Sequence, residues 1–373
     1  MRLDELIAEG ERVLTVCNAC RYCEGYCAVF PAMERRLTFA PADLNYLANL
    51  CHGCGECYYA CQYAPPHEFA INVPKVLTQI RGASYRQYAW PSGFARLFDR
   101  NGLISSLVLA VCLVLALLLA SLVSRPTGVL DPPVKPGDFY AVVPHGVMAW
   151  AFGLVSLLVV MALVGGFLRF WRESGEGLKT FAQPFALRAA LADITKLEYL
   201  DGRGAGCTYP DAQQSQARRW FHHLTFYGFL LCFAATCVGT LYHYGFGWQA
   251  PYEWLSVPVI LGTLGGTGLL IGTAGLYWLK SISDKALADR EQNGMDIAFI
   301  ALLFLTSLTG LLLLGFRETA AMGLFLVVHL GVVMALFLTL PYGKFVHGIY
   351  RGAALVRYAL ERSRPGLTMG REQ

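Results

Sequence analysis

The sequence has little charge for its length. Asp, Glu, Lys and Arg make up 15% of its 373 residues, against about 25% in soluble globular domains. The shortage is uneven, because residues 1–100 are charged and rich in cysteine whereas residues 101–373 contain long apolar stretches. We therefore predict a mainly α chain, with a soluble head at 1–100 and a membrane-embedded part at 101–373. A net charge of +4 gives no reason to expect nucleic-acid binding.

Several familiar motifs are also missing. Nothing resembles a cleavable signal peptide, so we do not expect a small secreted domain held together by disulfides. No G-x-G-x-x-G motif follows a predicted strand, which argues against a flavin or nicotinamide domain in this chain. The glycine-rich run GTLGGTG at 262–268 lies inside an apolar stretch, where small residues favour close helix packing. The sequence contains no C-x-x-C-H motif for covalent haem attachment.

Eight cysteines form two runs of identical spacing, C-x2-C-x2-C-x3-C. The runs are Cys17, Cys20, Cys23, Cys27 and Cys51, Cys54, Cys57, Cys61. In two-cluster ferredoxins the fourth cysteine of each run serves the other cluster. We therefore predict one [4Fe–4S] cluster on Cys17, Cys20, Cys23, Cys61 and a second on Cys51, Cys54, Cys57, Cys27. Structural zinc usually takes two separated pairs of ligands, which fits this spacing less well.

The second part of the chain predicts a six-helix membrane bundle. One crossing of the hydrocarbon core needs about 20 apolar residues. Six stretches meet this requirement almost without charge, at residues 103–123, 141–168, 222–243, 256–279, 296–316 and 321–343.

Lysine and arginine are distributed unevenly around these spans. If the head is cytoplasmic, 27 of the 30 lie on the head's side of the membrane and 3 on the opposite side. Because cytoplasmic loops are enriched in Lys and Arg, we expect the head and both termini in the cytoplasm. The loop 169–219 then lies on that side. It holds an amphipathic stretch at 184–200, predicted as a helix on the membrane surface, followed by a turn in which Cys207 has no evident metal partners.

Ionisable residues inside membrane spans are rare and suggest function. Here they are mostly histidines, and two histidines on facing helices can bind the iron of haem b. His329 and His347 are 18 residues apart, which is five turns, so on one continuous helix both face the same way. His222 and His243, 21 residues apart on the third span, are about 60° apart in phase.

The direction of the spans then suggests pairs. The third span runs outward and the sixth runs inward, so His222 or His223 shares the inner side with His347. His243 and His329 share the outer half, with His145 as the alternative to His243. The sequence therefore predicts one or two bis-histidine haems b.

Four basic residues flank the inner histidines. They are Arg218, Arg219, Lys344 and Arg351. Haem propionates are carboxylates, so we predict charge-assisted hydrogen bonds from these side chains. The general enrichment of basic residues on the cytoplasmic side explains their positions equally well.

Four stretches resemble the tricarballylate-utilisation protein B family, which includes the citrate-utilisation B proteins. They are 20–36 (CRYCEGYCAVFPAMERR), 206–211 (GCTYPD), 218–244 (RRWFHHLTFYGFLLCFAATCVGTLYHY) and 340–351 (LPYGKFVHGIYR). The resemblance covers essentially the whole chain. The last spans also resemble, more distantly, the cytochrome b subunits of respiratory nitrate reductase and membrane heterodisulfide reductase.

The resemblance implies a multi-pass protein of the bacterial inner membrane. It would take electrons from a soluble FAD-dependent dehydrogenase, which in the family oxidises tricarballylate to cis-aconitate. It would pass them through two [4Fe–4S] clusters and haem b to quinone, giving flavoprotein:quinone oxidoreductase activity together with the partner. Electron transfer between fixed ligands needs no general acid or base, so we assign no catalytic residue.

Two other functions are weighed against this one. A subunit of a heterodisulfide reductase or another dehydrogenase-type respiratory complex would usually carry cysteine-rich CCG motifs, and this sequence has none. A membrane redox sensor would be expected to carry an output domain, for which the 30 residues after the last span are too few. The oligomeric state, including a homo-oligomer, is left open.

Overall fold

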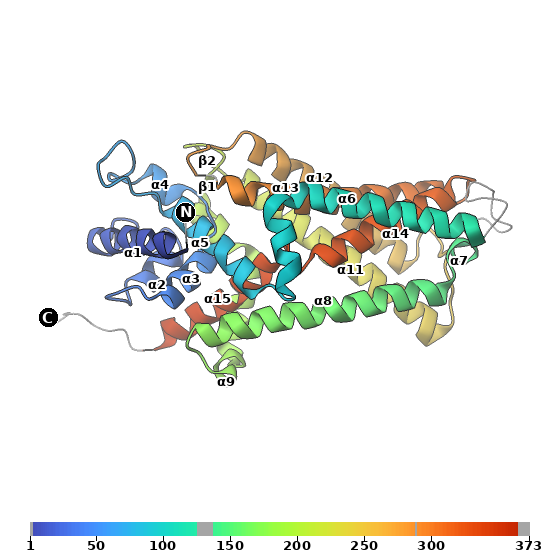
Figure 1. The fold of residues 1–373 in the computed structure, drawn as a ribbon, viewed down its shortest axis with the longest axis horizontal. Coiled ribbons are helices and arrows are strands. Elements are labelled where there is room, and N and C mark those ends of the chain that lie inside the picture. The colour runs from blue at the N-terminus through green and yellow to red at the C-terminus, as the bar shows by residue number, and fades with distance from the viewer. Residues whose placement is uncertain (1–2, 125–136, 288, 365–373) are drawn as a thin grey trace.

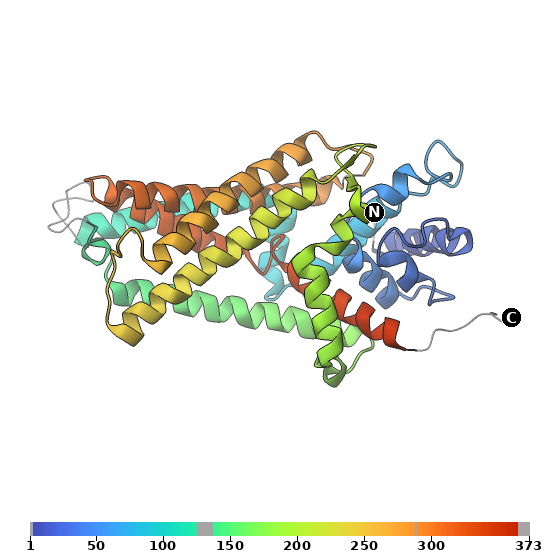
Figure 2. The ribbon, with the colours of Figure 1, turned by 180° about the vertical axis from the view of Figure 1, so that it is seen from behind.

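The computed structural model describes residues 3–124, 137–287 and 289–364. Within these residues the fold is mainly α, as predicted. Figure 1 shows the small helical head at one end of a long bundle of helices, and Figure 2 shows the same arrangement from behind.

The head consists of five helices, two of them only one turn long. They are α1 (Leu3–Cys20), α2 (Val29–Met33), α3 (Pro41–Leu50), α4 (Glu56–Tyr59) and α5 (Val73–Tyr88). Proline stands at the first position of α3, where it loses no helical hydrogen bond. The first helix extends into the first cysteine run and ends at Cys20. Cys17 and Cys20 therefore lie on a helix and not on a loop.

Six described helices are long and apolar enough to cross a membrane, which confirms the predicted number. Their candidate spans are Gly102–Ser121 within α6 (Ser92–Ser124), α8 (His145–Glu173), α11 (Ala217–Phe246), α12 (Val257–Ser281), Gln292–Phe316 within α13 (Arg290–Phe316), and α14 (Met322–Thr339). Many of their large apolar side chains are exposed in the isolated chain, as expected for surfaces that face lipid.

The remaining elements are short, apart from α10 and α15. They are α7 (Phe139–Val142), α9 (Leu178–Phe181), α10 (Pro184–Lys196), η1 (Glu198–Leu200), η2 (Gly202–Gly204), β1 (Cys207–Thr208), β2 (Gln214–Ser215) and α15 (Val346–Ser363). The strands β1 and β2 pair antiparallel. The predicted amphipathic helix at 184–200 is present as α10, which ends at Lys196 and buries Ala186 and Ala190.

The last span ends earlier than predicted. The helix α14 stops at Thr339, and a separate helix, α15, begins at Val346. Pro341 and Gly343 lie in the connection, and proline interrupts a helix because it lacks the backbone N–H that a helix needs. The prediction that His329 and His347 face the same way on one continuous helix is therefore wrong.

The glycine-rich run on α12 packs closely against α11, as predicted. A Cβ atom added to Gly265 would lie 2.8 Å from the carbonyl oxygen of Gly228 and 2.8 Å from the amide nitrogen of Cys232. Only glycine allows two helix backbones to approach so closely. This contact fixes α11, the helix that carries His222, His223 and His243.

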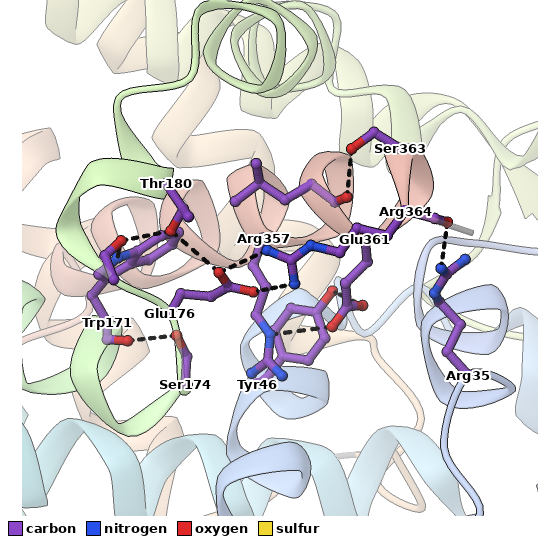
Figure 3. A network of polar contacts seen from close by, with 12 residues as sticks. Arg35, Tyr46, Trp171, Ser174, Glu176, Thr180, Arg357, Glu361, Ser363 and Arg364 are labelled. Carbon is purple, nitrogen blue, oxygen red and sulfur yellow. Dashed lines mark hydrogen bonds and ion pairs between the residues drawn. The ribbon is translucent and has the colours of Figure 1, made fainter. Parts of the chain in front are cut away.

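The C-terminal helix α15 completes the core of the head. Its residues Tyr350 and Leu355 belong to the same buried cluster as Leu14 and Leu47 of the head. Figure 3 shows the polar side of this contact, where Glu361 of α15 accepts a hydrogen bond from Tyr46 of α3 at 3.1 Å. The head is therefore built from both ends of the chain.

Candidate metal centres

The two cysteine runs come together in the head. The thiols of Cys61, Cys23 and Cys20 lie close enough to Cys17 to raise its pKa. The thiols of Cys54 and Cys51 likewise contribute to the raised pKa of Cys27. The fourth cysteine of each run thus lies near cysteines of the other run, and the exchange of ligands between the two clusters stays a prediction.

These thiols share an apolar environment. Burial, followed by the neighbouring Cys61, raises the pKa of Cys17 to about 12, and the same causes raise the pKa of Cys23 to about 12. Burial also raises the pKa of Cys57 well above its ordinary value. Buried thiols without charge-neutralising metal stay protonated, so loading iron onto them must release protons.

The donor set fits [4Fe–4S] clusters. All twelve cysteines lie in the described ranges, and all are free thiols. No three His, Cys, Asp or Glu side chains of the described residues converge as ligands of one metal ion. A cubane does not need such convergence, because each thiolate binds its own iron at a separate corner. Cys17, Cys20, Cys23, Cys57 and Cys61 line a common cavity, together with apolar residues such as Phe30 and Ile71.

The structure brings His222 and His347 together at the inner end of the bundle. His222 lies on α11 and His347 on α15, and their ring centroids are 6.2 Å apart. An iron held about 2 Å from one nitrogen of each imidazole would place the two centroids roughly 6 Å apart. The pair therefore has the separation that a shared haem iron requires.

The hydrogen bonds of this pair also suit a metal. Nδ1 of His347 lies 2.6 Å from the carbonyl oxygen of Lys344. A carbonyl only accepts, so Nδ1 carries the proton and Nε2 keeps its lone pair, which is the orientation found in metal-ligating histidines. The buried Nδ1 of His222 has no hydrogen-bond partner among the described residues. The residues present therefore fit a bis-histidine haem at this position.

His223, the other candidate for the inner site, points elsewhere. Its ring contacts Trp220 and Tyr227 of the same helix. Since consecutive helical residues differ by about 100° in direction, only one of the two neighbours can face α15. The structure places His222 there.

The outer histidines do not form the predicted pair. The rings of His243 and His145 are stacked, with centroids 3.8 Å apart and planes 14° apart. Two rings in face contact leave no room for a haem between them. His329 instead lies beside α13, where its Nδ1 is 3.0 Å from the hydroxyl of Thr309, and no ring contact joins it to His243 in the described part of the chain.

The four basic residues near the inner pair already have protein partners. Arg218 donates to the carbonyl oxygens of Gly53 and His52, at 2.6 and 3.0 Å, and Arg351 donates to that of Cys51 at 2.7 Å. Arg219 forms an ion pair with Asp201. Lys344 lies 2.8 Å from Asp296, which also binds Lys280 at 2.8 Å. Their predicted role toward haem propionates stays a prediction.

One residue of this region was missed by the sequence reasoning. Cys207, predicted as a plain loop cysteine, is buried and its side chain contacts that of Cys54. The only local signal was the glycine before it. Gly206 has a φ of +99°, and a Cβ there would lie 2.3 Å from the backbone of Ser215, so the turn that buries Cys207 requires glycine.

Comparison with known proteins covers both parts of the chain. Residues 10–89 match the family described as the Fer4-like domain of citrate utilization protein B, and residues 100–368 match the family described as citrate utilization protein B. The citrate utilization protein B of Escherichia coli is 54% identical over 363 residues, which are 97% of this chain and 94% of the relative. No solved structure matches the chain.

The match to a Fer4-like domain agrees with the paired cysteine runs, and both indicate iron–sulfur clusters in the head. The second match spans all six candidate membrane helices. The resemblance seen in the sequence is confirmed, and the chain belongs to the citrate utilization protein B family.

Proposed function

We propose that this protein reoxidises the reduced flavin of a soluble partner dehydrogenase and passes the electrons to the quinone pool. The observation that carries the proposal is the position of the His222/His347 pair. The helices α11 and α15 that hold this pair also bind the second cysteine run, through Arg218 and Arg351. The proposed cluster ligands and the proposed haem ligands therefore lie close together, at the end of the membrane bundle that carries the head.

In this proposal the eight cysteines hold two [4Fe–4S] clusters, and His222 and His347 hold one haem b. When bound, these groups take up and release electrons one at a time. The protein keeps the ligands in place and limits access of water. The carbonyl of Lys344 orients His347, and the helix α15 seals the core of the head beside the cysteine runs.

The partner is proposed to be an FAD-dependent dehydrogenase of a tricarboxylate. The relative from Escherichia coli is named for citrate utilization, and the family resemblance in the sequence suggested tricarballylate. Tyr22, inside the first cysteine run, and Leu37, soon after it, are exposed by 65% and 70%. Such exposed large side chains beside a cluster suit the docking of a soluble flavoprotein. The head would face the cytoplasm, where the positive charges gather.

The test uses the full-length protein in lipid nanodiscs, with a chemically reduced flavoprotein and a soluble quinone. We expect a b-type haem spectrum that becomes reduced on adding the flavoprotein and reoxidised on adding quinone. His347→Ala is the matched variant, in which the clusters should still be reduced while no haem signal remains. A protein that carries haem but is never reduced by any flavoprotein would contradict the proposal.

A further inference from the structure

The second cysteine run is fastened to the two helices that carry the inner histidines. The carbonyl oxygen of Cys51 accepts hydrogen bonds from Arg351 of α15 and from Arg81 of α5, both at 2.7 Å. The next two carbonyls, those of His52 and Gly53, accept from Arg218 of α11 at 3.0 and 2.6 Å. Three arginines thus hold three consecutive carbonyls of this loop.

Two of these arginines, Arg218 and Arg351, each lie one turn from a histidine of the inner pair. Arg218 precedes His222 by four residues on α11, and Arg351 follows His347 by four residues on α15. Residues four apart lie on the same helix face. The faces of α11 and α15 that carry His222 and His347 therefore also carry the guanidinium groups that donate hydrogen bonds to the cysteine loop.

The loop before α11 covers the second run from another side. The side chain of Cys207 contacts Cys54. A Cβ atom added to Gly55 would lie 2.5 Å from the carbonyl oxygen of Thr208, so the strand β1 approaches this turn as closely as glycine permits. The second run is therefore enclosed by segments that follow the head in sequence.

The first run has different surroundings. In both ribbon views α1 extends away from the bundle (Figures 1 and 2). Tyr22, between Cys20 and Cys23, is 65% exposed. The two runs thus differ in position, one facing outward and the other held against α11 and α15.

We propose that Arg218 and Arg351 are positioning residues that hold the second cysteine run against the His222/His347 pair. The cluster on Cys51, Cys54, Cys57 and Cys27 then exchanges electrons with the haem, while the cluster of the first run faces the flavoprotein. Each exchange moves one electron, oxidising one centre as it reduces the other, with no bond or proton involved. This inference rests on the function proposed above.

The first test asks which cluster is near the haem in the unaltered protein. Electron paramagnetic resonance of the oxidised protein, reduced by radiolysis at 77 K so that reduced clusters are trapped beside haem that is still oxidised, should show that oxidised low-spin haem speeds the spin relaxation of only one cluster signal. We expect this signal to persist in Cys17→Ser, which loses the first cluster, and to vanish in Cys54→Ser. Enhancement that is confined to the first cluster would overturn the inference while leaving the proposed function intact.

The second test measures how much Arg218 and Arg351 contribute to the rate of electron transfer from the clusters to the haem. We expect the double variant Arg218→Gln/Arg351→Gln to keep haem, and to slow haem reduction by dithionite-reduced clusters by at least about 10-fold, as with other outer-shell partners of metal sites. Arg364→Gln, at the residue that follows α15 and pairs with Glu176, is the control and should leave the rate unchanged. An unchanged rate in the double variant would overturn the role of the arginines.

If the double variant loses the second cluster, the relaxation measurement on the unaltered protein still decides which cluster lies beside the haem. Absence of haem from the unaltered protein would refute the proposed function itself. The two failures are therefore distinct.

Discussion

Removing the carboxylate of Glu361 should loosen the helix α15 from the head. Glu361 accepts from Arg36 at 2.5 Å, from Tyr46 at 3.1 Å and from Arg357 at 3.2 Å. The side chains of Arg36, Arg357 and Glu361 are each only 10% exposed. Glu361→Ala would leave two guanidinium groups nearly buried without this partner, and Figure 3 shows one of them, that of Arg357, beside Glu361.

Breaking a buried ion pair by removing one partner costs about 3–5 kcal/mol. We expect the lower end, about 3 kcal/mol, because Asp43 still lies 2.7 Å from Arg36 and 3.6 Å from Arg357. A free-energy change of about 1.4 kcal/mol alters an equilibrium constant tenfold. The state in which α15 is detached from the head should therefore become roughly 100-fold more populated.

Hydrogen exchange measures this population directly. Backbone amides of the buried stretch 353–360 should exchange roughly 100-fold faster in Glu361→Ala, if opening and closing are fast relative to exchange. Glu318→Gln is the control, since Glu318 is 60% exposed and 3.7 Å from Arg317, and surface pairs contribute little. An acceleration of less than about fivefold at 353–360, equivalent to only about 1 kcal/mol, would refute the reasoning.

Three further predictions concern the membrane part. His222→Ala should abolish the b-type haem spectrum and keep both cluster signals, whereas His223→Ala should keep the haem; the opposite result would mean that the wrong neighbour was chosen. His243→Ala should leave the haem content per chain unchanged, because its ring is stacked on another imidazole, and a loss of half would indicate a second haem. Gly265→Ala should destabilise the contact of α11 with α12 by about 1–3 kcal/mol, seen as a lower melting temperature in detergent. Gly262→Ala, whose Cβ would be 3.8 Å from its nearest neighbour, should show no such change.

The pairing of the outer histidines shows where helical phase stops being informative. The phase of His243 on α11 gives the direction of its side chain, but not the helix that lies opposite. The neighbour turns out to be His145 of α8, and this contact depends on how six helices are arranged around one another. For the same reason, the sequence left either His222 or His223 as the inner partner of His347.

The turn at Pro341 and Gly343 explains why the predicted relation between His329 and His347 was wrong. A proline and a glycine at the end of an apolar stretch can end a helix or lie just beyond it, and the phase calculation assumed that the helix continued. The structure ends α14 at Thr339 and begins α15 at Val346. His347 thereby belongs to a helix packed in the head, and it still meets α11.

Local spacing alone predicted the cluster ligands and determined the spans of this protein. Cysteines two or three residues apart must share one short segment, and about 20 consecutive apolar residues cross a bilayer whatever their neighbours are. Only the tertiary structure decided the partners of Arg218, Arg351 and Cys207, which meet the second cysteine run from more than 150 residues away in sequence. Such contacts depend on the packing of whole helices, and no periodicity in a single segment encodes them.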